Sequence, residues 1–348
     1  MGYALKRGSA YRNFLLATLT VAISSLCAFA VLEITARIVL SNPIPLFVPS
    51  ENDRLIYELN PEHPEINAYG MRQGEFARDE LADSFVIAAI GDSHTYSADS
   101  ALKENAFPAR LEKHLAEITG RKVKVLNFGV PGYNMAQELE VLKVKALPFQ
   151  PDLIILQYCI NDEHLSSYIK PEHAWLNSTI HSSALVSRAW QKLVYSRFGQ
   201  THILRHVERR FPDLLLFTPG LVGTPIARES DPAHAPHPPR AKDQVPVRYH
   251  NVVGWENLVK NVRLFGGVAR DAEIPLIATG FIEHGNAELY ENSGFRVYSF
   301  FDIFENRDMR EFGYDPDNTA THFSDRGSDF IGRALAAYIN AVFLTRSP

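Results

Sequence analysis

The stretch SFVIAAIGDSHTYS, residues 84–97, decides how the rest of the chain is interpreted. Its first half is an uninterrupted apolar run, and its second half begins abruptly with Gly91, Asp92, Ser93 and His94. A continuous apolar run of this length is typical of a strand buried on both faces, as in a parallel sheet. The polar residues that follow indicate either a simple turn or a nucleophilic serine held at the end of that strand.

Downstream, short apolar runs alternate with amphipathic segments. Strands are expected at about 85–90, 123–127, 152–158, 274–279 and 297–302, and helices at about 104–119, 136–147, 255–270 and 327–343. This alternation predicts an α/β protein, in which a central parallel sheet of about five strands is covered by helices on both faces. Residues 84–348 would form this domain, 163–250 an insertion within it, and 41–83 a linker and lead-in.

Residues 1–40 predict a membrane anchor. Residues 14–32 carry no charge and are just long enough to span a hydrocarbon core as a helix. Three basic residues precede this segment, and that bias predicts a cytoplasmic N-terminus with the main domain on the far side, the periplasm in a Gram-negative cell. Cleavage after the small-x-small triplet at 28–30 is the alternative; it is disfavoured because apolar residues continue beyond it.

Composition excludes several classes of function. The 348 residues carry a formal net charge of −5, and 46% are hydrophobic, which is ordinary for a globular domain with a sizeable core. A nucleic-acid partner is disfavoured because phosphate binding needs a basic surface. Cys27 and Cys159 are the two cysteines, too few for a disulfide framework or a thiolate metal site.

Polar or glycine-rich clusters follow three of the predicted strands. Ser93 follows the first, Gly132 lies in LNFGVPGYN (residues 126–134) after the second, and Asn161 follows the third. Ligands bind outside the carboxyl ends of the strands in an open parallel sheet, so these residues are expected to face one site. His322, in TATHFSDRG (residues 319–327), precedes the last predicted helix.

These residues suffice for ester chemistry. A serine hydroxyl is a weak nucleophile and needs a base, for which His322 is the candidate. Attack of Ser93 on an ester carbonyl creates an oxyanion, which the Ser93 N–H, the Gly132 N–H and the Asn161 side-chain amide could stabilise. The expected catalytic set is therefore Ser93, His322, Gly132 and Asn161, and the reaction needs neither a metal nor an organic cofactor.

In this order, the four blocks resemble those of the SGNH hydrolase superfamily, also called the GDSL-like lipases and acylhydrolases. The resemblance covers about residues 84–343 and implies a flavodoxin-like three-layer fold with serine esterase or acyltransferase chemistry. INAYGMR, residues 66–72, also resembles the lead-in of membrane-anchored bacterial members. Resemblance and location together favour an esterase acting on an acyl ester, acetyl included, of a cell-envelope glycan or lipid.

One position departs from the family pattern. The family usually places an aspartate three residues before the histidine, or two in some branches, and here those positions hold Thr319 and Ala320. His322 would then be oriented by Asp317 on a rearranged loop, by a backbone carbonyl, or by nothing. The last case predicts a catalytically degenerate protein that binds glycan or partner proteins, and an O-acyltransferase is a further alternative.

Overall fold

The computed structural model describes residues 2–39, 44–170, 183–196, 221–223, 242, 245–318 and 321–345. The chain divides into two compact units, one made of residues 1–44 and 171–220, the other of residues 45–170 and 221–348. Much of the predicted insertion at 163–250 lies outside the described residues, as do Thr319 and Ala320.

The first unit contains two described helices, α1 (Gly2–Val39) and α6 (Ala184–Tyr195). Within the described part of the chain, α1 is the one helix long and apolar enough to cross a membrane. Its segment Tyr11–Ile38 has a mean hydropathy of 2.3 in its most apolar stretch, where no residue is buried. The helix therefore includes the whole uncharged segment 14–32.

The second unit is built on a parallel sheet, in which five strands are described. The strands are β3 (Phe85–Gly91), β4 (Val123–Gly129), β5 (Leu153–Tyr158), β8 (Leu276–Gly280) and β9 (Phe295–Val297). They pair in the order β4-β3-β5-β8-β9, which is the flavodoxin-like order 2-1-3-4-5. The predicted α/β fold with a central parallel sheet is confirmed.

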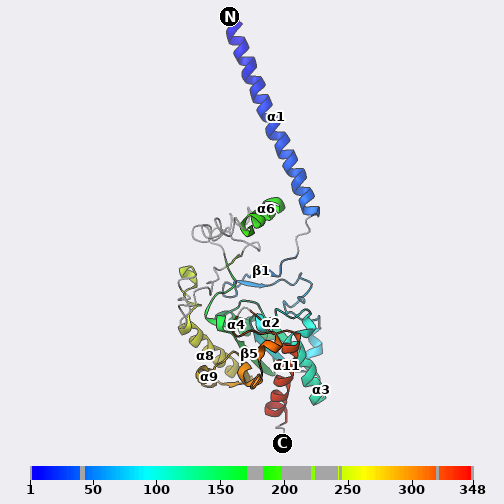
Figure 1. Ribbon diagram of the computed structural model, residues 1–348, viewed down its shortest axis with the longest axis vertical. Coiled ribbons are helices and arrows are strands. Elements are labelled where there is room, and N and C mark those ends of the chain that lie inside the picture. Colours follow the sequence, from blue (N-terminus) through cyan, green and yellow to red (C-terminus); the bar gives the residue numbers. More distant parts are fainter. Residues whose placement is uncertain are drawn as a thin grey trace. The chain divides into compact units, whose positions relative to one another are not determined.

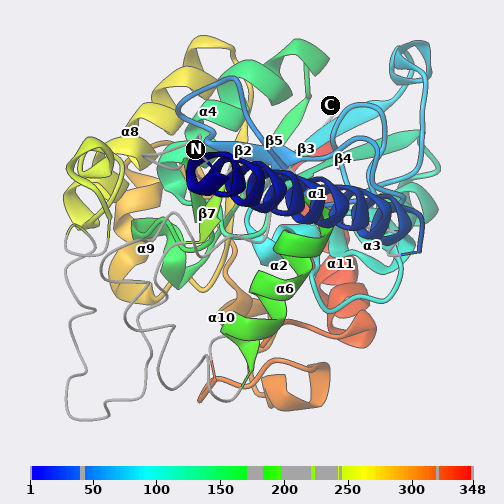
Figure 2. The same cartoon turned by 90° about the horizontal axis from the view of Figure 1, so that it is seen from above.

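Helices cover both faces of this sheet (Figures 1 and 2). On one side lie α3 (Phe107–Thr119) and α11 (Asp325–Ile339), and on the other α4 (Met135–Val141), α8 (Trp255–Asp271) and α9 (His284–Glu291). Ile87 and Ala89 of β3 pack in the core formed with α3 and α11. Alternate strand residues point to opposite faces, so Ala88 and Ile90 face the other layer, and both are buried. This double burial explains the uninterrupted apolar run.

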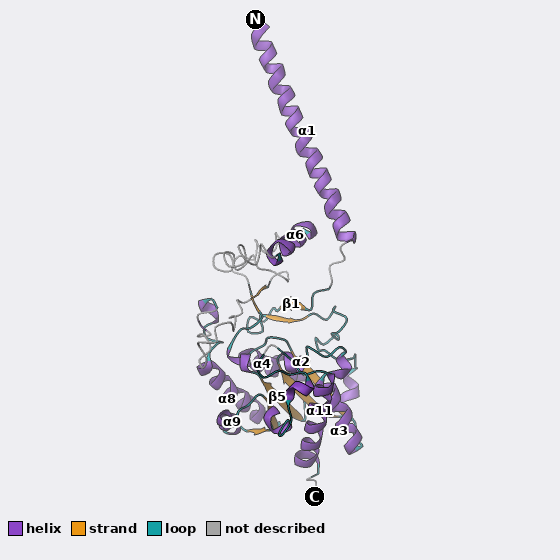
Figure 3. Cartoon of the chain, viewed as in Figure 1, coloured by secondary structure: helices purple, strands orange, loops and turns teal. Residues whose placement is uncertain are grey.

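Shorter elements complete the unit (Figure 3). Two antiparallel pairs are formed by β1 (Phe47–Pro49) with β2 (Tyr57–Leu59), and by β6 (Tyr168–Ile169) with β7 (Val222–Gly223). Two helices are only one turn long, α2 (Ser93–Tyr96) and α10 (Phe300–Ile303). Turns of 3-10 helix span 78–81, 103–105, 147–149, 160–163, 247–249 and 309–312. Turns of π-helix, Leu142–Ala146 and Asn340–Leu344, extend α4 and α11.

The strand predicted at 297–302 is wrong in most of its length. β9 ends at Val297, and α10 follows it. The Ser299 hydroxyl accepts the Asp302 N–H at 3.2 Å, while the Asp302 carboxylate accepts the Ser299 N–H at 2.8 Å. This reciprocal capping box starts a helix, and its serine-to-aspartate spacing was visible in the sequence beneath the apolar pattern.

The lead-in before β3 covers the sheet edge at β4. The Gln73 side-chain oxygen accepts the Asn127 N–H at 2.7 Å, and the Asn127 amide donates to the Arg72 carbonyl at 3.4 Å. An edge strand presents unpaired backbone groups, and the lead-in occupies part of this row. These two bonds join the lead-in to β4.

The end of β4 lies against α2 because residue 129 is glycine. A Cβ atom at Gly129 would lie 2.2 Å from the Tyr96 backbone nitrogen and 2.6 Å from the Thr95 carbonyl carbon. Both neighbours are backbone atoms, which cannot turn aside as a side chain can. The close approach of β4 to α2 therefore requires glycine.

We expect Gly129→Ala to lower the free energy of unfolding by about 1–3 kcal/mol, the usual cost of overpacking a tight site. Gly74→Ala is the matched control, because a Cβ atom at that position would meet nothing within 4 Å. Thermal unfolding of the purified protein in detergent measures both. Equal melting temperatures for the two variants would show that the α2 backbone can move aside.

Candidate active site

The pairing of β3 with both β4 and β5 brings the predicted site loops to one edge of the sheet. Gly91 at the end of β3 pairs with Gly129 at the end of β4, and Ile90 pairs with Leu156 of β5. The Val130 N–H then donates to the Gly91 carbonyl at 3.1 Å. Strand order reverses between β3 and β5, and this switch point is where open α/β sheets bind ligands.

Ser93 is the first residue of α2, and its position is fixed from both sides. The Asp92 carboxylate accepts the His94 N–H at 2.9 Å and caps the helix. The Thr95 hydroxyl donates to the buried Gln157 side chain of β5 at 3.0 Å. Ser93 itself is only partly buried. The turn therefore holds a serine hydroxyl accessible at the mouth of the sheet.

The His322 ring lies beside that hydroxyl. Its Nε2 atom is 2.8 Å from the Ser93 Oγ atom, although the two residues are 229 positions apart. Two residues further on, Ser324 fixes the chain. Its N–H and its hydroxyl both donate to the Phe312 carbonyl at 2.8 Å. The Ser93–His322 separation is one at which an imidazole can take a proton from a serine.

The far side of the His322 ring faces Asp99, a residue that sequence reasoning missed. Its Oδ1 atom is 3.5 Å from the His322 Nδ1 atom, and its Oδ2 atom accepts the His322 backbone N–H at 3.3 Å. Asp317, one of the alternatives considered from the sequence, instead binds Arg310 and is 84% exposed. No local pattern could have marked Asp99, because its approach to His322 depends on the fold.

Arg72 of the lead-in holds the turn that carries Asp99. Its guanidinium donates to the carbonyls of Tyr96 at 3.0 Å, Ser97 at 2.9 Å and Ser100 at 2.8 Å. It also stacks over the Tyr96 ring, 4.7 Å from the centroid. Arg72 is buried, and three charge-assisted bonds to successive parts of one turn restrain it strongly.

Gly132 and Asn161, the predicted oxyanion donors, are joined through Ser166. The Asn161 amide donates to the Ser166 hydroxyl at 3.1 Å, and that hydroxyl donates to the Gly132 carbonyl at 3.2 Å. Gly132 has a φ of +79°, and a Cβ there would lie 1.8 Å from the Ser167 hydroxyl. Among the described residues, no hydrogen bond links this group to Ser93 or His322. The four predicted residues thus form two pairs at the same edge of the sheet. Ser93 pairs with His322, and Gly132 is joined to Asn161.

His94 packs beneath the His322 ring, with the two ring centroids 4.8 Å apart. The ring also lies near three further aromatic rings: Phe281 at 5.0 Å, and Tyr314 and Phe323 at 5.9 Å. Burial lowers the pKa of His94 to about 4, so the ring is neutral at neutral pH. His94 therefore packs against the His322 ring without placing a second positive charge beside it.

Two buried acids, Glu138 and Asp162, interact with each other next to Asn161. Burial raises the pKa of Glu138 and Asp162 well above the ordinary values, and neighbouring carboxylates reinforce the effect. Asp162 directly follows Asn161, where a negative charge would oppose a developing oxyanion. The raised pKa favours the uncharged acid at this position.

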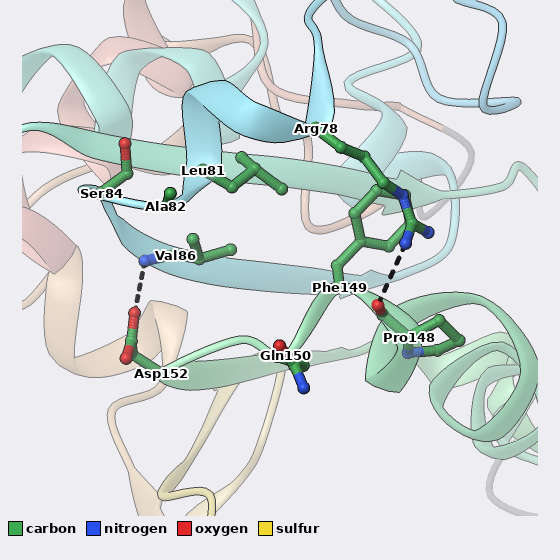
Figure 4. Close-up of a pocket in the computed structure, with 9 residues that line it drawn as sticks. All are labelled: Arg78, Leu81, Ala82, Ser84, Val86, Pro148, Phe149, Gln150 and Asp152. Carbon is green, nitrogen blue, oxygen red and sulfur yellow. Dashed lines mark hydrogen bonds between the residues drawn. The ribbon is translucent and has the colours of Figure 1, made fainter.

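Two cavities lie away from Ser93. The larger, of about 380 Å³, sits at the opposite end of the sheet and is lined by Arg78, Val86 and Asp152 among others (Figure 4). The Asp152 carboxylate accepts the Val86 N–H at 2.7 Å, and Arg78 stacks 4.4 Å from the Phe149 ring centroid. The two charged side chains that line this cavity therefore already interact with other groups of the protein. The second, of about 220 Å³, lies beside β1 and β2.

The described residues contain no group of three or more His, Cys, Asp or Glu side chains that could hold a metal ion.

A family model and several solved structures are similar to this chain. The GDSL-like Lipase/Acylhydrolase family model matches residues 89–330. The lipase/acylhydrolase from Enterococcus faecalis is 12% identical with a TM-score of 0.42, the alignment covering 76% of this chain and 99% of that one. The esterase EstA from Pseudoalteromonas sp. is 8% identical with a TM-score of 0.41, covering 74% and 98%.

A two-domain esterase active on acetylated mannans is 13% identical with a TM-score of 0.37, and the alignment covers 78% of this chain and 53% of that one. No curated protein matches this chain in sequence.

We expect the buried His94 to make the protein less stable in acid. Its pKa is about 4 in the folded protein and 6.5 in a free side chain, so below pH 6.5 the unfolded chain takes up a proton that the folded one does not. Between pH 7 and pH 5 this linkage removes about 2 kcal/mol of stability. His94→Phe should lack that increment.

Urea unfolding of both proteins at the two pH values measures the difference. The wild type should lose more stability on acidification than His94→Phe. Equal losses would mean that His94 is already charged or solvated in the fold.

Proposed function

The chain belongs to the GDSL-like lipase/acylhydrolase family, and we propose that it is a membrane-anchored serine esterase. The observation that carries this proposal is the 2.8 Å contact between Ser93 Oγ and His322 Nε2 at the carboxyl edge of the sheet. The uncharged segment of α1 and the basic residues before it support an anchor with a cytoplasmic N-terminus. The esterase domain then lies outside the cytoplasm.

In the first half of the reaction, the Ser93 oxygen attacks the ester carbonyl while its proton passes to His322 Nε2. The carbonyl oxygen becomes an oxyanion, which the N–H groups of Ser93 and Gly132 and the Asn161 amide receive. Asn161 exchanges its bond to Ser166 for one to the oxyanion. The carbon–oxygen bond to the alcohol then breaks, and His322 returns the proton to the leaving oxygen.

In the second half, water replaces the alcohol. His322 takes a proton from this water as its oxygen attacks the acyl carbon, and the same donors bind the second oxyanion. The bond between the acyl carbon and the Ser93 oxygen then breaks, His322 returns the proton to that oxygen, and the free carboxylic acid is released. If a sugar hydroxyl took the place of water, the same steps would transfer the acyl group.

Asp99 acts as the positioning residue for the base. Its carboxylate faces Nδ1 of His322, which favours the tautomer with the proton on Nδ1 and leaves Nε2 free to accept from Ser93. The Asp99 side chain is 55% exposed, so water weakens this interaction relative to a buried triad aspartate. Asp99 takes the role that the family assigns to the position of Thr319 or Ala320.

The proposed substrate is an acyl ester, acetyl included, on a glycan or lipid of the cell envelope. This choice follows from the family and from the proposed location of the domain beyond the membrane. Ser93 is accessible at the sheet edge, as a site that acts on an extended or surface-bound ester requires.

We expect Ser93→Ala to reduce hydrolysis of p-nitrophenyl acetate to the rate without enzyme and to abolish labelling by a fluorophosphonate probe. Ser84→Ala, at the opposite end of β3, is the matched control and should retain both. Turnover by Ser93→Ala at the control rate would refute the proposed nucleophile. Product analysis with an added sugar acceptor separates hydrolysis from transfer.

We expect Asp99→Asn to lower kcat by about 10- to 100-fold with little change in KM, less than the roughly 10⁴-fold loss for a buried triad aspartate. Asp317→Asn is the control, because that carboxylate binds Arg310 rather than His322. Asp99→Glu should recover part of the activity. Equal kcat values for Asp99→Asn and the wild type would mean that Ser93 and His322 act as a dyad without Asp99.

A further inference from the structure

Glu33 of α1 holds the beginning of α6. Its carboxylate accepts the Ala184 N–H at 2.7 Å, the Leu185 N–H at 3.2 Å and the Ser183 hydroxyl at 2.8 Å. Arg37, one turn along α1, donates to the same carboxylate at 2.8 Å. The first N–H groups of a helix have no acceptor within it, and Glu33 supplies an acceptor for two of them.

The position of Glu33 along α1 sets the level at which α6 begins. Glu33 directly follows the uncharged segment 14–32. As a helix this segment is roughly 28 Å long, close to the thickness of a hydrocarbon core. If segment 14–32 spans the membrane, Glu33 and the start of α6 lie at the depth where the acyl chains end and the headgroups begin.

The exposed surface of α6 is amphipathic. Val186, Ala189 and Leu193 are spaced at i, i+3 and i+7 and therefore share one face. All three are exposed, with Val186 and Leu193 each 43% exposed. Arg188 and Lys192 lie on the neighbouring face and are exposed as well. An uncovered apolar stripe flanked by two cations is the pattern of a helix that lies in a membrane interface.

We propose that α6 lies in the membrane interface beside the end of α1, with Val186, Ala189 and Leu193 among the acyl chains. Arg188 and Lys192 then reach the phosphate groups, which carry the complementary charge. The inference rests on the membrane anchorage of the proposed function but not on its catalytic chemistry. It gives the chain a second contact with the lipid surface in addition to the span.

The test uses the full-length protein in vesicles of phosphatidylcholine and phosphatidylglycerol, with Cys27→Ala as the background. One cysteine at a time is added to this background and labelled with an environment-sensitive fluorophore. The test positions are Val186, Ala189 and Leu193, and the control positions are Arg188 and Lys192. Spin-labelled acyl chains serve as the quencher. Background protein without an added cysteine checks that the buried Cys159 is not labelled.

The proposal expects blue-shifted emission and at least twofold stronger quenching at the three apolar positions than at the two cationic ones. Equal emission and quenching at all five would overturn it. Blue-shifted emission without quenching would also overturn it, because protein rather than lipid would then cover the stripe.

Glu33→Ala should reduce the difference in quenching between positions 193 and 192. An unchanged difference would mean that Glu33 does not hold α6 at the interface. Flotation of the vesicles tests the anchor separately, since a protein that fails to float has no span and the inference falls with it. Fluorophosphonate labelling of the same samples reports the catalytic site independently of every lipid result.

Discussion

The pairing of β3 between β4 and β5 is the constraint on which the site depends. In a parallel sheet the carboxyl ends of neighbouring strands lie together, so the pairing of Gly91 with Gly129 and of Ile90 with Leu156 brings three loops to one edge. The backbone can approach so closely only because Gly129 has no side chain. Strand pairing thus brings Ser93 to this edge, and the Asp92 cap and the Thr95–Gln157 hydrogen bond fix its position there.

The surroundings of His322 then determine what this serine can do. One side of the imidazole meets Ser93, the other meets Asp99, and the neutral His94 packs beneath it. Arg72, from a segment that precedes the sheet, holds the turn that carries Asp99. A carboxylate is therefore brought to the ring from the loop that follows Ser93 rather than from the loop that carries His322.

Much of this arrangement could be predicted from the sequence because its signals are local. The apolar run at 85–90, buried on both faces, indicated a parallel strand, and the alternation with helices indicated the layered fold. Gly-Asp-Ser, the glycine-rich turn and Asn-Asp each follow a strand directly, so their sheet edge could be inferred. The short α10 was mistaken for a strand, since its apolar residues outweighed the serine cap at Ser299.

The sequence by itself therefore determined the sheet, the anchor-like helix and the residues at the strand ends, because spacing and hydrophobic pattern act over a few residues. The tertiary structure alone decided that Asp99 faces His322, that Ser166 joins Asn161 to Gly132, and that Glu33 binds the start of α6. These contacts join residues without a shared local pattern. Their distances depend on how whole elements pack, which no short stretch of sequence encodes.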